Sequence, residues 1–396
     1  MSSRSSRPPR RRRTSTRVRQ NRALAALCSI AALGLVAVIA SGNGWGSDVP
    51  TGTSVRTGSD AAAVASHAQT TPVPTTPTGG GVSLAAVGDT VMGTPEFGLP
   101  PAGGSTLFNA VKPLLKGDVV IGNLESALAT GTSTKCAGRS AGSCFAFASP
   151  PEYVRNLKKA GFTVMNLANN HSNDWGPSGL RSTIRALESV GILHTGRPGE
   201  IAVQRTADGT KVAFVGVSPY PWSQDAMDIP GAQRLVRKAA ALAPIVVANM
   251  HVGAEGAAYR HVPEGSESYL AEPRGWTRGL ARGMVDAGAD LVVGHGPHVM
   301  RGMEFRRGRL IAYSLGNFMG YRVFNTRSYN GLSGVLQVKM AADGRFLSGR
   351  LVPTRLSSDG VPSPGGASIS DVAALSRADF GRAAARLSAS GSITAP

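Results

Sequence analysis

The chain has 396 residues, of which 42% are hydrophobic, and it carries a formal net charge of +18. This length suits one large domain or two modest ones, and a basic balance of this size favours polyanionic partners. A nucleic-acid-binding protein needs a basic stripe with interleaved aromatic side chains, and the sequence shows none, so we expect no nucleic-acid partner.

The first 22 residues carry nine Arg and no acidic residue, so they contribute half of the net charge of +18. An uncharged, mostly apolar stretch follows at 23–40. As a helix, its 18 residues would span about 27 Å, close to the thickness of a bilayer core. We therefore expect residues 1–22 to form a basic cytoplasmic tail and 23–41 to form a transmembrane signal anchor, with the rest of the chain exported.

Cleavage after Ala40 is the alternative, and it would release a secreted protein. Cys28 lies inside the apolar run and not after it, which does not fit lipoprotein attachment. Residues 42–80 are rich in Ser, Thr, Pro and Gly and predict a flexible linker. In an exported domain, Cys136 and Cys144 predict a local disulfide within a Gly/Ser/Thr-rich loop, and two free thiols are the alternative.

Short apolar runs alternate with helical patterns between residues 82 and 355. The runs are rich in Val, Ile and Leu, which is typical of strands buried on both faces; they are 82–87, 118–121, 163–167, 212–217, 244–248, 290–293 and 310–313. Helices are predicted at 150–160, 177–190, 233–242 and 275–287. This alternation predicts an α/β fold with a sheet layered between helices. Residues 356–396 predict a largely flexible tail with a short helix near 371–387.

Six of the predicted strands run directly into polar residues that can bind a metal. The candidates are Asp89, Asn123, Glu125, Asn170, His171, Asp174, His251, Glu255, His295, His298 and Asn317. Four of the seven His of the chain are among them. Side chains at the carboxyl ends of strands converge in α/β sheets, and His with Asp, Glu and Asn suits Zn, Mn or Fe. A lone His would more simply be a hydrogen-bonded loop residue, but the set as a whole predicts a metal site.

The order of these motifs resembles the CapA family of poly-γ-glutamate capsule synthesis proteins. The motifs are Gly-Asp at 88–89, Gly-Asn-Leu-Glu at 122–125, Leu-Ala-Asn-Asn-His at 167–171, His-x-Gly-x-Glu at 251–255, Gly-His-x-Pro-His at 294–298 and Tyr-Ser-Leu-Gly-Asn-Phe at 313–318. The resemblance covers roughly residues 82–355. That family is similar to the calcineurin-like metallophosphoesterases, so the resemblance implies a four-layer α/β/β/α sandwich, preceded here by the transmembrane helix.

The resemblance also implies roles for single residues. His171 would act as a general acid, and the expected metal ligands are Asp89, Glu125, Asn170, His251, His295 and His298. Asn123, Asp174, Glu255 and Asn317 would support them. The expected cofactor is one or two divalent ions of Mn, Zn or Fe.

Several positions depart from the related patterns. Val91 stands where the phosphoesterases usually have His, and Asn123 stands where they have a bridging Asp. Val252 and Gly296 stand where CapA relatives usually have Trp and His. Losing a bridging carboxylate removes charge that would hold two cations together, so a single ion, or a weakly bound second one, is expected.

Two functions are compatible with these features. One is a metal-dependent hydrolase that acts on phosphoester or amide bonds in an anionic cell-envelope polymer of the poly-γ-glutamate capsule type. The other is a non-catalytic subunit that binds such a polymer beside a membrane synthase. Five Arg near the last motifs favour the second if they are free, or else form an ordinary solvated hairpin; they are Arg301, Arg306, Arg307, Arg309 and Arg322.

Overall fold

The computed structural model describes residues 81–132, 134–139 and 144–396. The predicted basic tail, signal anchor and linker lie outside these residues. Within the described part of the chain, no helix has both the length and the apolar character that crossing a bilayer requires.

The first of two large sheets has β1 (Val82–Val91) at its centre. Its strands follow the order β20-β21-β18-β17-β1-β2-β5-β6, with β16 beside β1 and β19 beside β18. On one side of β1, the strands β2 (Val119–Leu124), β5 (Val164–Asn166) and β6 (Leu193–Thr195) run parallel to it. On the other side, β16 (Asn317–Gly320) is parallel to β1 and β17 (Leu332–Met340) is antiparallel to it.

The second large sheet has the order β14-β15-β13-β10-β8-β7, with β9 beside β8. Its strands are β7 (Ala202–Arg205), β8 (Lys211–Ser218), β9 (Gln224–Asp225), β10 (Ile245–His251), β13 (Leu291–His295), β14 (Met303–Arg306) and β15 (Arg309–Ala312). β8, β10, β13 and β15 are parallel and almost wholly buried, as expected for strands covered on both faces. Each predicted apolar run coincides with one strand of the two large sheets.

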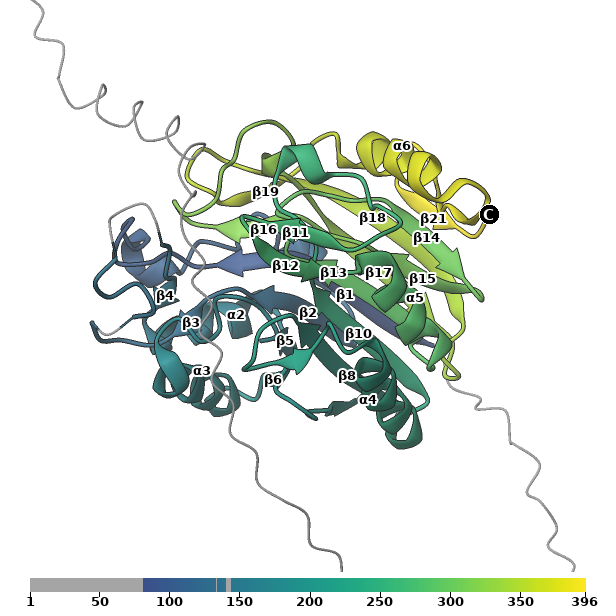
Figure 1. The fold of residues 1–396 in the computed structure, drawn as a ribbon. Helices are drawn as coiled ribbons and strands as arrows, with labels where there is room; N and C mark the ends of the chain where they lie inside the picture. The colour runs from purple at the N-terminus through teal and green to yellow at the C-terminus, as the bar shows by residue number, and fades with distance from the viewer. Residues whose placement is uncertain (1–80, 133, 140–143) are drawn as a thin grey trace, which may run out of the picture. The chain divides into compact units, whose positions relative to one another are not determined.

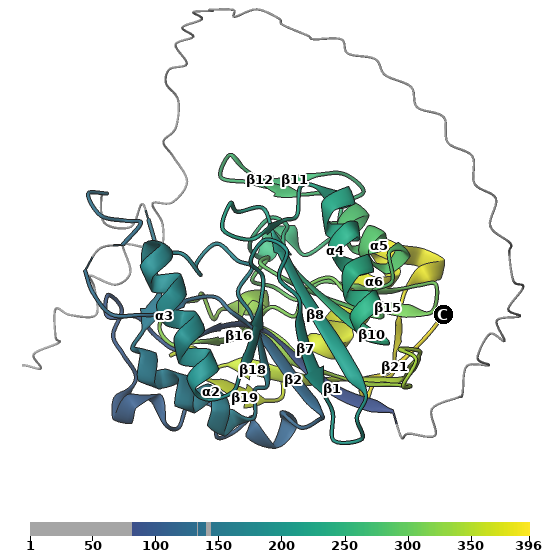
Figure 2. The same ribbon diagram turned by 90° about the horizontal axis from the view of Figure 1, so that it is seen from below.

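The two sheets pack face to face, and helices cover their outer faces (Figures 1 and 2). Leu84 and Ile121 of the first sheet meet Phe214, Val247 and Val293 of the second in the central core. α2 (Val154–Ala160) and α3 (Gly176–Ser189) cover the outer face of the first sheet, and α4 (Ile229–Leu242) and α5 (Thr277–Asp286) cover that of the second. The mixed α/β fold is therefore confirmed, and its layers run helices, sheet, sheet, helices.

The C-terminal segment corrects the expectation of a largely flexible tail after residue 355. After β18 (Phe346–Leu356), it forms β19 (Pro362–Pro364), α6 (Ser368–Phe380), β20 (Arg386–Leu387) and β21 (Ser392–Thr394). β21 pairs with β18, and its Ile393 is buried in the central core. Strands of two or three residues carry too few positions for an alternating pattern to show in the sequence, which explains the error.

The remaining elements are short. The two-stranded pairs are β3 (Ala127–Leu128) with β4 (Ala148–Ser149), and β11 (Glu267–Tyr269) with β12 (Glu272–Gly275). The 3₁₀ helices are η1 (Pro101–Gly104), η2 (Lys112–Leu114), η3 (Pro151–Tyr153), η4 (Ala257–Tyr259), η5 (Ser328–Gly331) and η6 (Gly381–Ala383).

A buried ion pair fixes the hairpin of β11 and β12 to the loop after β13. Arg301 is fully buried, and its Nη1 and Nη2 donate to the two carboxylate oxygens of Glu267 at 3.0 and 2.7 Å. Its Nε donates to the carbonyl of Tyr259, and Nη2 also donates to that of Ala254. Every nitrogen of this guanidinium therefore has an acceptor, as a buried charge requires.

We expect Glu267→Ala to lower the free energy of unfolding by about 3–5 kcal/mol, because it leaves the charge of Arg301 buried without a partner. Urea unfolding followed by circular dichroism measures the change. The matched control is Asp343→Ala, which breaks the solvent-exposed pair between Asp343 and Arg345 and should change the stability by less than about 1 kcal/mol. Equal losses in the two variants would contradict the structural role of the buried pair.

Candidate metal centre

Strand register aligns the polar residues of the first sheet. Asp89 at the end of β1 is paired with Asn123 of β2, and Asn123 is paired with Asn166 of β5. On its other side, Asp89 is paired with Asn317 of β16. The four residues therefore lie side by side in one row across neighbouring strands. The row is at the carboxyl end of β1, where ligands of α/β folds bind.

The second sheet contributes His251 and His295, which are paired with each other at the ends of β10 and β13. Both side chains are buried and approach the row on the first sheet. His251 Nδ1 lies 3.2 Å from the amide nitrogen of Asn123, and His295 Nδ1 lies 3.8 Å from Asp89 Oδ1. The site thus forms where the carboxyl ends of strands from both sheets meet.

A close backbone contact holds Asp89 in place. Its backbone N–H donates to the carbonyl oxygen of Gly316 at 2.9 Å. A Cβ atom at Gly88 would lie 1.8 Å from that same oxygen, so only glycine allows β1 and the segment before β16 to approach this closely.

Asp89, Glu125 and His298 form the most compact group of potential metal ligands in the described part of the chain, with one donor atom of each within 4.8 Å of the others. His298 Nδ1 lies 3.2 Å from Asp89 Oδ2, and its Nε2 lies 3.6 Å from Glu125 Oε1. Glu255 is next to them, 3.9 Å from His298 Nε2. His298 has a φ of +57°, an uncommon backbone conformation for a residue with a side chain, and Asn317 Oδ1 lies 2.8 Å from its Nδ1.

The ionisation of the group indicates a strongly negative environment around His298. Burial alone would lower the pKa of His298, but Glu125, Asp89 and Glu255 raise it to about 10. Burial raises the pKa of Glu125 well above its usual range. Burial also favours the neutral forms of the other two imidazoles: it lowers the pKa of His295 to about 4 and that of His251 well below its usual range. Two carboxyl groups around one imidazole, beside two imidazoles that burial keeps neutral, supply oxygen and nitrogen donors for a metal cation.

Unpaired polar atoms support the same conclusion. Buried side-chain atoms without a hydrogen-bond partner include Asp89 Oδ2, both carboxylate oxygens of Glu125, Asn170 Oδ1, His251 Nε2 and His295 Nδ1. Such atoms are rare in folded proteins because each costs free energy, so a cluster of them calls for an explanation. Carboxylate oxygens, an amide oxygen and imidazole nitrogens are together the donor set of a divalent metal, so these residues fit one.

The side chain of Asn123 is hydrogen-bonded on all sides. Its amide nitrogen donates to Asp89 Oδ1 at 2.8 Å, and its carbonyl oxygen accepts from Asn166 and Asn169. Asn166 and Asn169 are supporting residues that the sequence interpretation missed. The only sequence signal for them is their position at or just after the end of β5. An Asn at such a place more often marks a turn, so this signal is weak.

His171 and Asp174 form a second group. Asp174 Oδ2 lies 2.7 Å from His171 Nδ1, and the ring of Phe147 stacks on the imidazole with centroids 4.2 Å apart. Lys135 Nζ lies 2.6 Å from Asp174 Oδ1 and donates to the backbone carbonyl of Asn170. His171 and Asn170 line a cavity that Glu255 also lines, and Glu255 in turn lies 3.9 Å from His298 Nε2.

We expect His295→Ala to lower the metal content of the purified protein to about a tenth or less, because it removes one donor of the set. Inductively coupled plasma mass spectrometry measures the content after loading with Mn, Zn or Fe. His261→Ala is the control, since His261 is an exposed residue that pairs with Asp379. Unchanged metal in His295→Ala would exclude His295 from the ligands.

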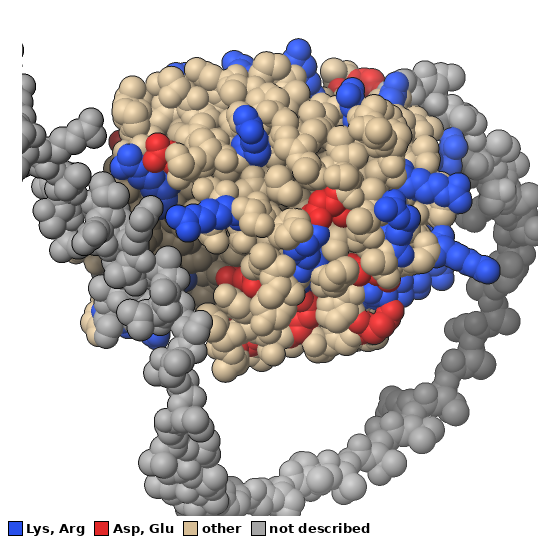
Figure 3. Space-filling model, turned by 90° about the horizontal axis from the view of Figure 1, so that it is seen from above, with Lys and Arg blue, Asp and Glu red and all other residues tan. Residues whose placement is uncertain are grey.

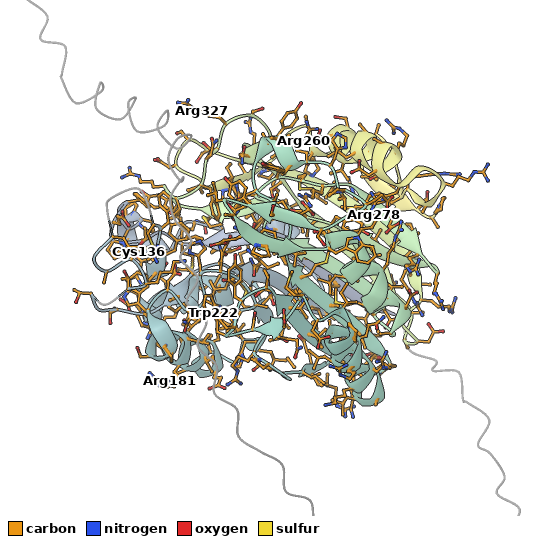
Figure 4. All side chains as sticks on the ribbon, viewed as in Figure 1. Cys136, Arg181, Trp222, Arg260, Arg278 and Arg327 are labelled. Carbon is orange, nitrogen blue, oxygen red and sulfur yellow. A yellow bond between two sulfur atoms is a disulfide. The ribbon has the colours of Figure 1, made fainter. Side chains whose placement is uncertain are left out.

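Cys136 and Cys144 are joined by a disulfide, and Cys136 lies in the loop at the left of Figure 4. We expect iodoacetamide to modify neither residue without a reductant and both after reduction, as peptide mapping by mass spectrometry would show. Modification of either residue in the unreduced protein would contradict the bond.

Comparison with known proteins supports the family resemblance. Residues 83–322 match the family described as bacterial capsule synthesis protein PGA_cap. The capsule biosynthesis protein CapA of Bacillus anthracis is 30% identical over 259 residues, which cover 60% of this chain and 59% of that protein. The PGA biosynthesis protein CapA of Bacillus subtilis is 30% identical over 284 residues, which cover 67% of this chain and 70% of that protein.

Among solved structures, a 5′-nucleotidase precursor from Thermus thermophilus matches with a TM-score of 0.39 and 14% identity, over 71% of this chain and 56% of that one. A similarity this distant carries no conclusion about activity. The family match, in contrast, spans well over half of the chain and contains every predicted metal ligand and the predicted general acid. The chain therefore belongs to the PGA_cap family of bacterial capsule synthesis proteins.

Proposed function

We propose that this protein is an exported, membrane-tethered hydrolase that uses a divalent metal to process an anionic cell-envelope polymer or its precursor. The observation that carries the proposal is the group of buried, unpaired donor atoms from Asp89, Glu125, His251 and His295 where the two sheets meet. Two of the similar relatives are named for capsule and PGA biosynthesis, which supports a polymer of the poly-γ-glutamate type. The layer order supports a relation to the calcineurin-like metallophosphoesterases.

The proposed metal ligands are Asp89, Glu125, Asn170, His251, His295 and His298, and the ion is Mn, Zn or Fe, with one or two ions bound. A bound divalent ion would supply Lewis acidity toward a phosphoryl or acyl oxygen and would lower the pKa of a coordinated water. Asn123, in place of a carboxylate, brings no charge of its own, which favours one tightly bound ion over two.

His171 is the proposed general acid. Asp174 Oδ2 accepts a hydrogen bond from Nδ1–H, so the imidazole is held in one orientation and Nε2 is the atom that can take up and release a proton. Stacking on Phe147 restricts rotation of the ring. Lys135 Nζ lies 2.6 Å from Asp174 Oδ1, so a positive charge faces this buried carboxylate on the side away from the imidazole contact at Oδ2.

The alternative, a polymer-binding subunit without catalysis, relied on free Arg side chains near the last motifs. Each of the five has an acidic partner: Arg301 with Glu267, Arg306 and Arg307 with Asp286, Arg309 with Asp290, and Arg322 with Asp359. Figure 3 likewise shows basic side chains toward the right of one face with acidic ones among and beside them. Paired charges of this kind hold an anionic polymer less strongly than free ones, so we favour the hydrolase.

The proposed location is the outer side of the cell membrane, with the helix at 23–41 as the tether and 42–80 as a spacer that lets the domain reach its polymer. A membrane synthase complex is the proposed partner. Release after cleavage at Ala40 would leave the catalytic proposal unchanged.

We expect the metal-loaded full chain to hydrolyse bis(p-nitrophenyl) phosphate or poly-γ-glutamate. His171→Ala should lower kcat by about 10²–10⁴-fold and keep its bound metal, because a general acid acts on the leaving group and does not hold the ion. Release of p-nitrophenol, shortening of the polymer on gels and metal analysis are the three readouts, and His261→Ala is the control. A metal-loaded wild-type protein that cleaves neither substrate would favour the polymer-binding alternative.

A further inference from the structure

A cavity of about 430 Å³ lies beside the metal-ligand candidates. His171 and Asn170 line one part of it, and Glu255, Tyr220 and Arg274 line another. Because the proposed general acid faces this space, a substrate bound for cleavage must place part of its structure here. The residues of the cavity that have no role in holding the metal are therefore candidates for recognising that part.

Arg274 differs from the other well-buried Arg side chains in how few of its nitrogens are paired. Arg274 is 4% exposed to solvent, and its Nη2 donates to Glu255 Oε1. Nη1 and Nε are buried without any acceptor, and the nearest carboxylate oxygen to Nε, from Glu272, is 3.7 Å away. In Arg301, by comparison, all three nitrogens have acceptors.

An incompletely paired buried guanidinium costs free energy unless another acceptor is supplied. The backbone of Arg274 is fixed, since its carbonyl accepts from Gly253 in the loop that leads to Glu255. Glu255 holds one end of the guanidinium group, and the Glu272 side chain is 59% exposed, so its charge is screened by water. Nη1 thus keeps two N–H donors without an acceptor, on a residue that lines the cavity.

The rest of the cavity suits an anion on a longer molecule. Lys135 and Arg139 add positive charge to the lining, although Lys135 is also paired with Asp174. Tyr220 and Trp222 stack on each other with centroids 5.4 Å apart and supply an apolar wall, and Trp222 is labelled in Figure 4. A carboxylate or phosphate group could contact the cations while an aliphatic or planar segment lies along the aromatic rings.

We propose that Arg274 binds the anionic group, a carboxylate or a phosphate oxyanion, by which the substrate is positioned in this cavity beside the metal centre. The inference rests on the proposed function, because it names the group that this site recognises. Arg274 is a binding and specificity-determining residue, and neither the metal ligands nor His171 duplicate its role.

The test is isothermal titration calorimetry of the full chain in mild detergent, stripped of metal with EDTA, with inorganic phosphate and with glutarate as separate probes. We expect millimolar or tighter binding of at least one anion. Arg274→Gln should weaken it by about tenfold or more, because a charge-assisted hydrogen bond is lost. Arg278→Gln is the matched control, since Arg278 is equally buried but lies on α5 and pairs with Glu264 (Figure 4).

A second variant covers the case in which Arg274→Gln does not fold. Glu272→Gln removes an exposed negative charge near Nε and should tighten anion binding by about two- to fivefold at low ionic strength. A preference for phosphate identifies a phosphoester substrate, and a preference for glutarate identifies a carboxylate polymer. The inference is overturned if the wild type binds neither anion, if folded Arg274→Gln binds as tightly as the wild type, or if Glu272→Gln leaves the affinity unchanged. Because no metal or turnover is involved, failure of the hydrolase proposal would show separately.

Discussion

The side-chain amide of Asn123 is the interaction on which the site depends. It donates to Asp89 from β1, lies beside His251 from β10, and accepts from Asn166 of β5 and from Asn169. One buried group therefore links three strands of the first sheet to a strand of the second. Since hydrogen bonds in a buried network restrict one another's geometry, this amide fixes the distance between the two sheets where the metal-ligand candidates converge.

The same residue explains how the site combines order with donor atoms that lack a hydrogen bond. Asn123 satisfies one oxygen of Asp89 and leaves the other without a hydrogen bond. Glu125, two residues further along the chain, has no hydrogen-bond partner for either oxygen. The network thus supports the backbone and the orientation of the ligands, while the donor atoms that face inward stay available. A site organised in this way binds a cation without having to rearrange, which lowers the free-energy cost of binding.

Much of the fold and the site could be predicted from the sequence, because the buried parallel strands are short apolar runs and six of the seven lead into a polar motif. Asp89, Glu125, His251, His295 and His298 were predicted for that reason, and the structure brings them together. The pairing of β21 with β18 could not be predicted, since Ile393 is a single apolar residue among polar ones. Arg274 was not identified either. A buried Arg and an exposed Arg look identical in a sequence, and only the count of its acceptors in three dimensions separates them.

The contact between Gly88 and Gly316 has a consequence for how this centre can change over evolutionary time. The two residues belong to motifs that are 228 positions apart in the chain, yet a methyl group at Gly88 would collide with the carbonyl of Gly316. A side chain at Gly88 would require the backbone around Gly316 to move. Exchange of either segment with that of a relative would therefore keep this contact only if both motifs were transferred together.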